Sequence, residues 1–99
     1  MKINFKKEEL IISSEKMTFD QAKENIPEGY RLPNKKELML MYCMNDENKF
    51  ELPKSNVWSS EEYIKRDGTS TSAFAVQFSN GYTGTIKKSE KCYALYAKK

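Results

Sequence analysis

The sequence has 99 residues, of which 38% are hydrophobic and 31% charged, and its formal net charge is +3. This length suits one domain, 1–99, because a second hydrophobic core would need a longer chain. The small positive charge does not by itself indicate nucleic-acid binding, and no apolar run reaches the roughly 18 residues of a membrane-spanning helix.

The ends of the chain and its cysteines bear on the cellular compartment. The segment Met1–Glu9 lacks the apolar core of a signal peptide, so we expect a cytoplasmic protein unless a leader has been removed. In a reducing compartment Cys43 and Cys92 are expected to be free thiols, with a disulfide between them as the alternative.

The first elements in chain order are short. The apolar residues Leu10–Ile12, together with Ile3 and Phe5, predict one or two short N-terminal strands. A first helix is expected to begin after Thr18, whose spacing from Gln21 is that of a capping box. The Pro-Glu-Gly segment that follows is expected to end this helix.

A second helix has a clearer pattern. Asn34 and Glu37 form another predicted cap, and Leu38, Met41 and Tyr42 then fall on one helical face. Two short helices in the first half and strands in the second predict an α+β fold. We expect the helices to pack on a small antiparallel sheet.

The second half contains a predicted hairpin. A three-residue loop, Ser79–Gly81, places Val76 opposite Gly84 and makes one face of the hairpin continuously apolar. Because Gly84 has no side chain, this position would leave room for a large side chain such as that of Trp58. One last strand is expected from three alternating apolar residues: Tyr93, Leu95 and Ala97.

Several conspicuous residues have structural interpretations that we prefer. Arg31 is expected to pair with a carboxylate or to cap carbonyl groups rather than to bind a ligand, because a partly buried guanidinium needs local partners. Trp58, the only tryptophan, is expected to lie in the core rather than to serve as a stacking platform.

The sequence contains no histidine, which removes the commonest general base and the commonest zinc ligand. Neither the serines nor the two cysteines have a conventional activating partner, so we expect no enzyme activity and no catalytic residues. We expect no cofactor and no metal site. The sequence words that hold calcium in lectins, E-P-N, Q-P-D and W-N-D, are absent, so calcium-dependent sugar binding is not expected.

Four segments in order resemble one bacterial and phage family: Gly29–Pro33, Val57–Ser60, Ala73–Gly81 and Lys91–Leu95. The family is the DUF1566 or Lcl C-terminal type, a branch of the C-type-lectin-like fold. The resemblance covers about residues 15–97. It implies a compact C-type-lectin-like domain that presents a binding surface, with a turn at Ser59-Ser60 whose hydroxyls satisfy nearby backbone groups.

The chain departs from the family pattern at three positions. Tyr30 stands where the family usually has tryptophan, and Lys91 stands where it has arginine. Asn25 occupies a position where the first helix often has cysteine, which argues against the family's disulfide between that helix and the last strand.

The segment 61–72 is the best candidate for a contact loop, with an inert connector as the alternative. It carries Tyr63, Ile64, Lys65 and Arg66, and tyrosine and arginine often supply binding energy at interfaces. With Tyr82, these residues predict a non-enzymatic, calcium-independent module for protein–protein interaction. Small size and a composition rich in lysine and asparagine suit a phage or mobile-element product that blocks a host protein.

The alternative is a nucleic-acid-binding protein that uses the lysine-rich C-terminal end. The lysines concerned are Lys87, Lys88, Lys91, Lys98 and Lys99. If they carry the binding, affinity should fall steeply with salt concentration.

Overall fold

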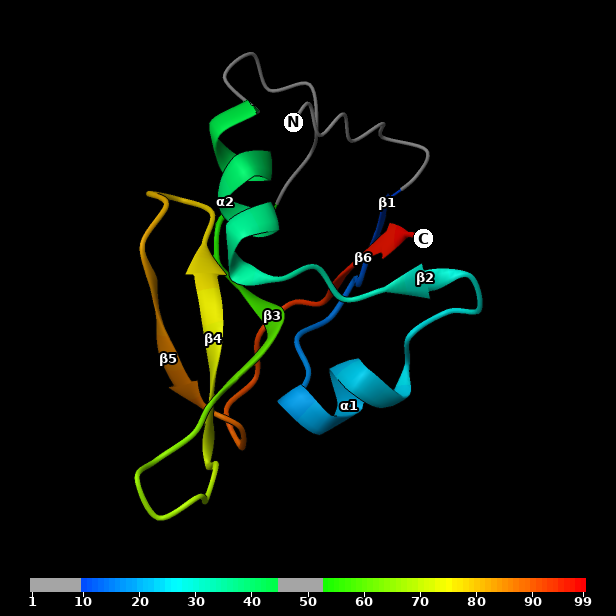
Figure 1. Ribbon diagram of the computed structural model, residues 1–99. Helices are drawn as coiled ribbons and strands as arrows, with labels where there is room; N and C mark the ends of the chain where they lie inside the picture. The colour runs from blue at the N-terminus through cyan, green and yellow to red at the C-terminus, as the bar shows by residue number, and fades with distance from the viewer. Residues whose placement is uncertain (1–9, 45–52) are drawn as a thin grey trace.

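The computed structural model describes residues 10–44 and 53–99, and Figure 1 shows their arrangement. Within these residues the chain forms two helices, α1 (Phe19–Glu24) and α2 (Lys35–Met44). The strands of the described residues are, in chain order, β1 (Leu10–Ile12), β2 (Tyr30–Arg31), β3 (Asn56–Tyr63), β4 (Ser72–Gln77), β5 (Thr83–Lys87) and β6 (Leu95–Lys98).

These elements confirm the α+β fold, but the described strands form two antiparallel sheets rather than one. The strand order is β1-β6-β2 in the first sheet and β3-β4-β5 in the second. A parallel bridge between Val57 and Tyr93 links them. The predicted strand at Leu10–Ile12 is confirmed, whereas Ile3 and Phe5 lie outside the described residues.

Neither described helix is long and apolar enough to cross a membrane.

Both helices begin at the predicted caps. The Thr18 hydroxyl accepts the Gln21 amide, and the Gln21 side chain accepts the Thr18 amide in return. At α2, the Glu37 amide donates to Asn34 Oδ1 at 2.8 Å, and the Asn34 amide donates to Glu37 Oε1 at 3.1 Å. Local spacing therefore fixes where each helix starts.

Arg31 has the structural role expected of it. Its Nη1 and Nη2 donate to the two carboxylate oxygens of Glu37, at 2.7 and 2.6 Å. This bidentate pair holds the pKa of Glu37 below its usual range, with burial opposing and the Asn34 amide adding to the shift. The same carboxylate thus anchors β2 and caps α2.

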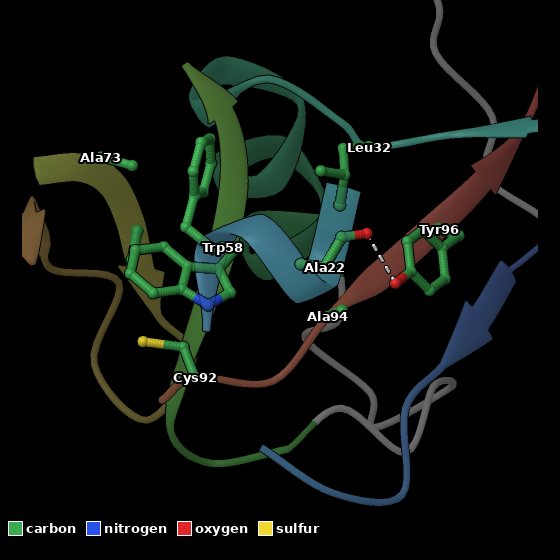
Figure 2. Packing of buried hydrophobic residues seen from close by; sticks show 9 residues of the cluster. Ala22, Leu32, Trp58, Ala73, Cys92, Ala94 and Tyr96 are labelled. Atoms are coloured by element: carbon green, nitrogen blue, oxygen red, sulfur yellow. Dashed lines mark hydrogen bonds between the residues drawn. The ribbon is translucent and has the colours of Figure 1, made fainter. Parts of the chain in front are cut away.

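Two hydrophobic clusters lie on opposite faces of the sheets. One packs α1 against β3, β4 and β6, and Figure 2 shows Trp58 at its centre with Ala22, Leu32 and Cys92 around it. The other packs Leu38 and Met41 of α2 against alternate residues of the same strands. Neighbouring residues of one strand therefore enter different clusters.

Trp58 is fully buried, as expected of a core residue. Its indole N–H donates to the Met17 carbonyl at 2.8 Å, and its ring meets Phe19 edge-on with centroids 5.4 Å apart. Met17 also exchanges backbone hydrogen bonds with Cys92, at 2.8 and 2.9 Å. The indole thereby joins β3 to the segments before α1 and before β6.

The predicted register of the β4–β5 hairpin is wrong by one residue. Val76 pairs with Thr83, and Gly84 pairs with Ala75. Phe78 lies in the turn and is buried in the hydrophobic cluster that contains Leu38 and Met41 of α2. The prediction assumed one apolar face, whereas β4 is buried on both faces and alternation does not specify its register. Gly81 has φ of 79°, a left-handed conformation that glycine adopts without steric cost.

The segment Ser59-Ser60 lies inside β3 and is not a turn, contrary to what the resemblance implies. The pairing of β3 with β4 shifts between Trp58 and Glu62, which marks an irregularity in the strand. The Ser59 hydroxyl accepts the Glu61 amide at 3.1 Å, so its expected role for local backbone is confirmed. The Ser60 amide donates instead to the Pro33 carbonyl at 2.9 Å.

Replacing Trp58 should lower the free energy of unfolding by more than the loss of buried apolar area alone would. We expect Trp58→Phe to lower the free energy of unfolding by about 2 kcal/mol through lost volume and a lost hydrogen bond, and Trp58→Ala by about 3–5 kcal/mol. Urea unfolding followed by far-ultraviolet circular dichroism measures both. Equal stability of Trp58→Phe and the wild type would contradict this account.

The Arg31–Glu37 pair should make stability depend on acid. Because the native pKa of Glu37 is lowered, its contribution is complete above the unfolded pKa of about 4.3 and is lost as pH falls through the native value. We expect Glu37→Gln to cost about 1–2 kcal/mol at pH 7 and progressively less at lower pH. Denaturant unfolding from pH 7 to pH 2.5 tests this, with Glu24→Gln as the exposed control.

Candidate protein-binding surface

The loop between β3 and β4 extends away from the rest of the domain (Figure 1). Because β3 continues to Tyr63 and β4 begins at Ser72, the predicted loop 61–72 shortens to residues 64–71, here called the hairpin tip. Tyr63 is 46% exposed and Ile64 is 64% exposed. An aromatic and an aliphatic side chain therefore meet solvent where the hairpin leaves the sheet.

Internal hydrogen bonds order the hairpin tip. The Lys65 amide donates to the Thr69 carbonyl at 2.8 Å, and the Gly68 amide returns to the Lys65 carbonyl at 2.9 Å. The Asp67 carboxylate accepts the amide and hydroxyl of Thr69, at 2.9 and 2.7 Å, which lowers the pKa of Asp67. Gly68 supplies the positive φ, 86°, that the turn needs.

Packing within the sheet positions Tyr63. Its ring meets Phe74 edge-on, with centroids 6.2 Å apart. The Lys35 ammonium also lies over the Phe74 ring, 3.8 Å from its centroid, and that lysine lies 3.5 Å from Glu61. The Tyr63 carbonyl accepts the Ser70 hydroxyl at 2.8 Å. Exposed Tyr63 is therefore supported by packing on one side and by the hairpin tip on the other.

The structure brings four of the five predicted contact residues together. Tyr63, Ile64, Lys65 and Arg66 are consecutive, exposed and adjoin or belong to the ordered tip. Tyr82 lies elsewhere: Tyr63 pairs with Ser72 at one end of β4, whereas the Tyr82 carbonyl accepts the amide of Gln77 at the other end. The two tyrosines are therefore offset by five residues of β4, about 17 Å along that strand, and lie on opposite sides of it.

Tyr82 forms a wall of a different, open groove. It is 70% exposed, and its ring lies over Gly84. The groove has a volume of about 290 Å³ and is lined by Asn56, Ala75, Gln77, Asn80, Tyr82, Gly84, Thr85 and Ile86. The predicted large side chain over Gly84 is thus that of Tyr82 and not that of Trp58.

The lysines of the C-terminal end divide between the two sheets. Lys87 and Lys88 lie at the end of β5, whereas Lys98 ends β6, and Figure 1 shows these strand ends well apart. The Lys88 ammonium lies 2.8 Å from Glu62, which lowers the pKa of that carboxyl. Lys65, predicted as a contact residue but not as a member of this lysine group, lies with Lys87 and Lys88, because the hairpin tip brings it to the end of β5.

These three lysines line an open groove of about 540 Å³ together with hydroxyl side chains, here called the basic groove. Its other lining residues are Ser70, Thr71, Ser72 and Ser89. The grouping depends on a long-range strand pairing, and no local motif in the sequence could have indicated it.

The described residues hold no group of three or more cysteine or acidic side chains that could bind a metal ion. Cys43 is an exposed thiol on α2 and Cys92 is a buried thiol beside Trp58, so the two are not bridged. Burial raises the pKa of Cys92 to about 11, with a nearby Lys16 opposing the shift.

No protein-family model matches the chain, and no curated protein matches it. The resemblance to the DUF1566 family therefore stays a prediction from the four sequence segments.

The two thiols should differ strongly in reactivity. With a pKa near 11, Cys92 has roughly 100-fold less thiolate at pH 8 than a thiol of pKa 9, and burial also blocks access. We expect iodoacetamide to modify Cys43 at least 100-fold faster in the native protein. Mass spectrometry of the Cys43→Ser and Cys92→Ala variants assigns each rate. Fast labelling of native Cys43→Ser would contradict the burial of Cys92.

Proposed function

We propose that this chain is a non-enzymatic protein-binding module of the cytoplasm, built on a C-type-lectin-like domain of the DUF1566 type. The hairpin tip and the adjoining Tyr63 form its contact surface. The partner is a protein of the host cell, which a phage or mobile-element product of this size would block.

One observation carries the proposal: exposed Tyr63 and Ile64 lie beside Lys65 and Arg66 on a turn that hydrogen bonds already order. A partner that binds an ordered loop loses less conformational entropy than one that must first order it. Tyrosine and arginine supply large contact areas and directed hydrogen bonds, which are common in residues that dominate binding energy. The surface therefore combines apolar area with charge in one small, prearranged loop.

The rest of the proposal has separate support. A chain without histidine lacks the commonest general base, which favours binding over catalysis. The free thiols Cys43 and Cys92 agree with the expected cytoplasmic location, because cysteines stay reduced in that compartment. The calcium-binding words of lectins are absent from the sequence, which supports calcium-independent contact with protein.

The test is affinity capture from nuclease-treated bacterial lysate with a mutated hairpin. We expect the wild type to retain a stoichiometric protein and Tyr63→Ala/Arg66→Ala to lose it. Titration of the recovered protein should show at least about 30-fold weaker binding, because removal of interface anchors costs 2 kcal/mol or more.

Ile11→Ala is the matched control, because Ile11 is an exposed apolar residue of the other sheet. It should bind as the wild type does. Thermal unfolding of each variant separates a lost contact from a lost fold, since Tyr63 also packs on Phe74. A captured protein that binds the double variant with unchanged affinity would refute the proposed surface.

The basic groove supports a second candidate, nucleic-acid binding. Lys65, Lys87 and Lys88 gather there, although Lys88 is paired with Glu62 and Lys98 lies on the other sheet. Retention that disappears with nuclease, falls steeply with salt and survives Tyr63→Ala would favour this candidate over protein binding.

A further inference from the structure

The two edges of the β3-β4-β5 sheet differ. Residues near the C-terminus cover the edge of β3, where the Trp58 amide donates to the Tyr93 carbonyl and the Tyr93 amide donates to the Asn56 carbonyl, both at 3.0 Å. The Ser60 amide, at the same edge, is bonded to Pro33. Across residues 10–44 and 53–99, no strand pairs with the outer edge of β5, which lies on the outside of the domain (Figure 1).

The register identifies the backbone groups that this edge presents. The Gln77 amide donates to the Tyr82 carbonyl at 2.8 Å, and the Lys88 amide donates to the Thr71 carbonyl at 3.0 Å, so the Tyr82 carbonyl and the Lys88 amide point toward β4. Hydrogen bonding alternates along an antiparallel strand. The backbone groups of Thr83 and Thr85 and the amide of Lys87 therefore point away from β4.

The edge lacks most features that keep strand edges apart. Proteins protect such edges with proline, with central charges or with very short strands. The edge strands of the other sheet, β1 and β2, have only three and two residues, whereas β5 has five. Strand β5 contains no proline, and its one charged residue, Lys87, lies at its end.

We propose that β5 pairs antiparallel with β5 of a second copy of this chain, about a two-fold axis at Thr85. The backbone groups of Thr85 then bond those of Thr85 in the second copy, and Thr83 pairs with Lys87 on either side. The two β3-β4-β5 sheets join into one sheet of six strands. This surface is separate from the hairpin tip and does not depend on the proposed partner.

The side chains of β5 fit this register. Two-fold symmetry places each Lys87 opposite a neutral Thr83, so like charges do not face each other, and opposing threonines favour strand pairing. On the face of the open groove, Ile86 of one copy lies opposite Gly84 of the other. A register shifted toward the C-terminus would instead bring the two Lys87 side chains together.

Gly84 and Tyr82 give the second copy an apolar place to pack. A Cβ atom at Gly84 would lie 2.7 Å from Tyr82 Cε1, so the ring occupies the position of the missing side chain. Ile86 of the second copy lies beside this ring and covers part of its 70% exposed surface. Glycine within a strand commonly marks such a close approach.

The β5–β5 contact buries little surface area, which limits the affinity of the dimer. Stable complexes bury about 800 Å² on each partner, more than a pair of five-residue strands provides. We therefore expect a reversible dimer with a dissociation constant between about 10 μM and 1 mM.

The test places charges on the proposed axis. Thr85→Glu and Thr85→Lys each set like charges opposite each other, so each variant alone should dimerise at least 10-fold more weakly than the wild type. An equimolar mixture should dimerise at least as well as the wild type, because glutamate then faces lysine. Sedimentation velocity at chain concentrations up to 1 mM measures all four samples. Thr71→Glu, at an exposed threonine off the edge, is the control and should match the wild type.

Dimerisation of the mixture also shows that both variants fold. A wild type that stays monomeric at 1 mM would overturn the proposal and leave the edge to an extended segment of another protein. A dimer that Thr85→Glu and Thr85→Lys leave unchanged would place the contact on another surface. Failure of the mixture to dimerise would equally refute pairing at Thr85.

Discussion

The buried indole of Trp58 is the contact on which the two halves of the domain depend. Its N–H bonds the Met17 carbonyl, and the backbone of Met17 is paired with that of Cys92. Strand β3, the approach to α1 and the approach to β6 therefore converge on one side chain. Because a buried indole N–H without an acceptor is costly, this hydrogen bond helps to hold β3 against the segments before α1 and before β6.

Strands β3 and β4 are buried on both faces, because the segments that meet at Trp58 cover one face and α2 covers the other. Val57 and Trp58, adjacent in β3, enter different clusters, and Ala75 and Val76 of β4 do the same. The strands β3 and β4 thus have little free face on which a partner could dock. Besides the two grooves, the sheet β3-β4-β5 offers other molecules its hairpin tip at one end and the outer edge of β5 along one side.

These two regions offer different chemistry. The hairpin tip presents side chains of mixed character on a turn held by Asp67 and Thr69, which suits recognition of one particular surface. The edge of β5 presents backbone groups, which suit any strand whose side chains are compatible, and a second copy meets that condition by symmetry. A dimer would carry two hairpin tips, so weak contacts with a repeated partner would reinforce each other.

The sequence by itself determined the α+β class, both helix starts, the buried tryptophan and the pairing role of Arg31. These depend on contacts within a few residues or on the cost of burying an unsatisfied polar group. Tertiary structure alone decided the β4–β5 register, the division into two sheets and the distance between Tyr63 and Tyr82. Alternating polarity specifies a register only when one face is exposed, and packing against α1 and α2 removed that signal from β4.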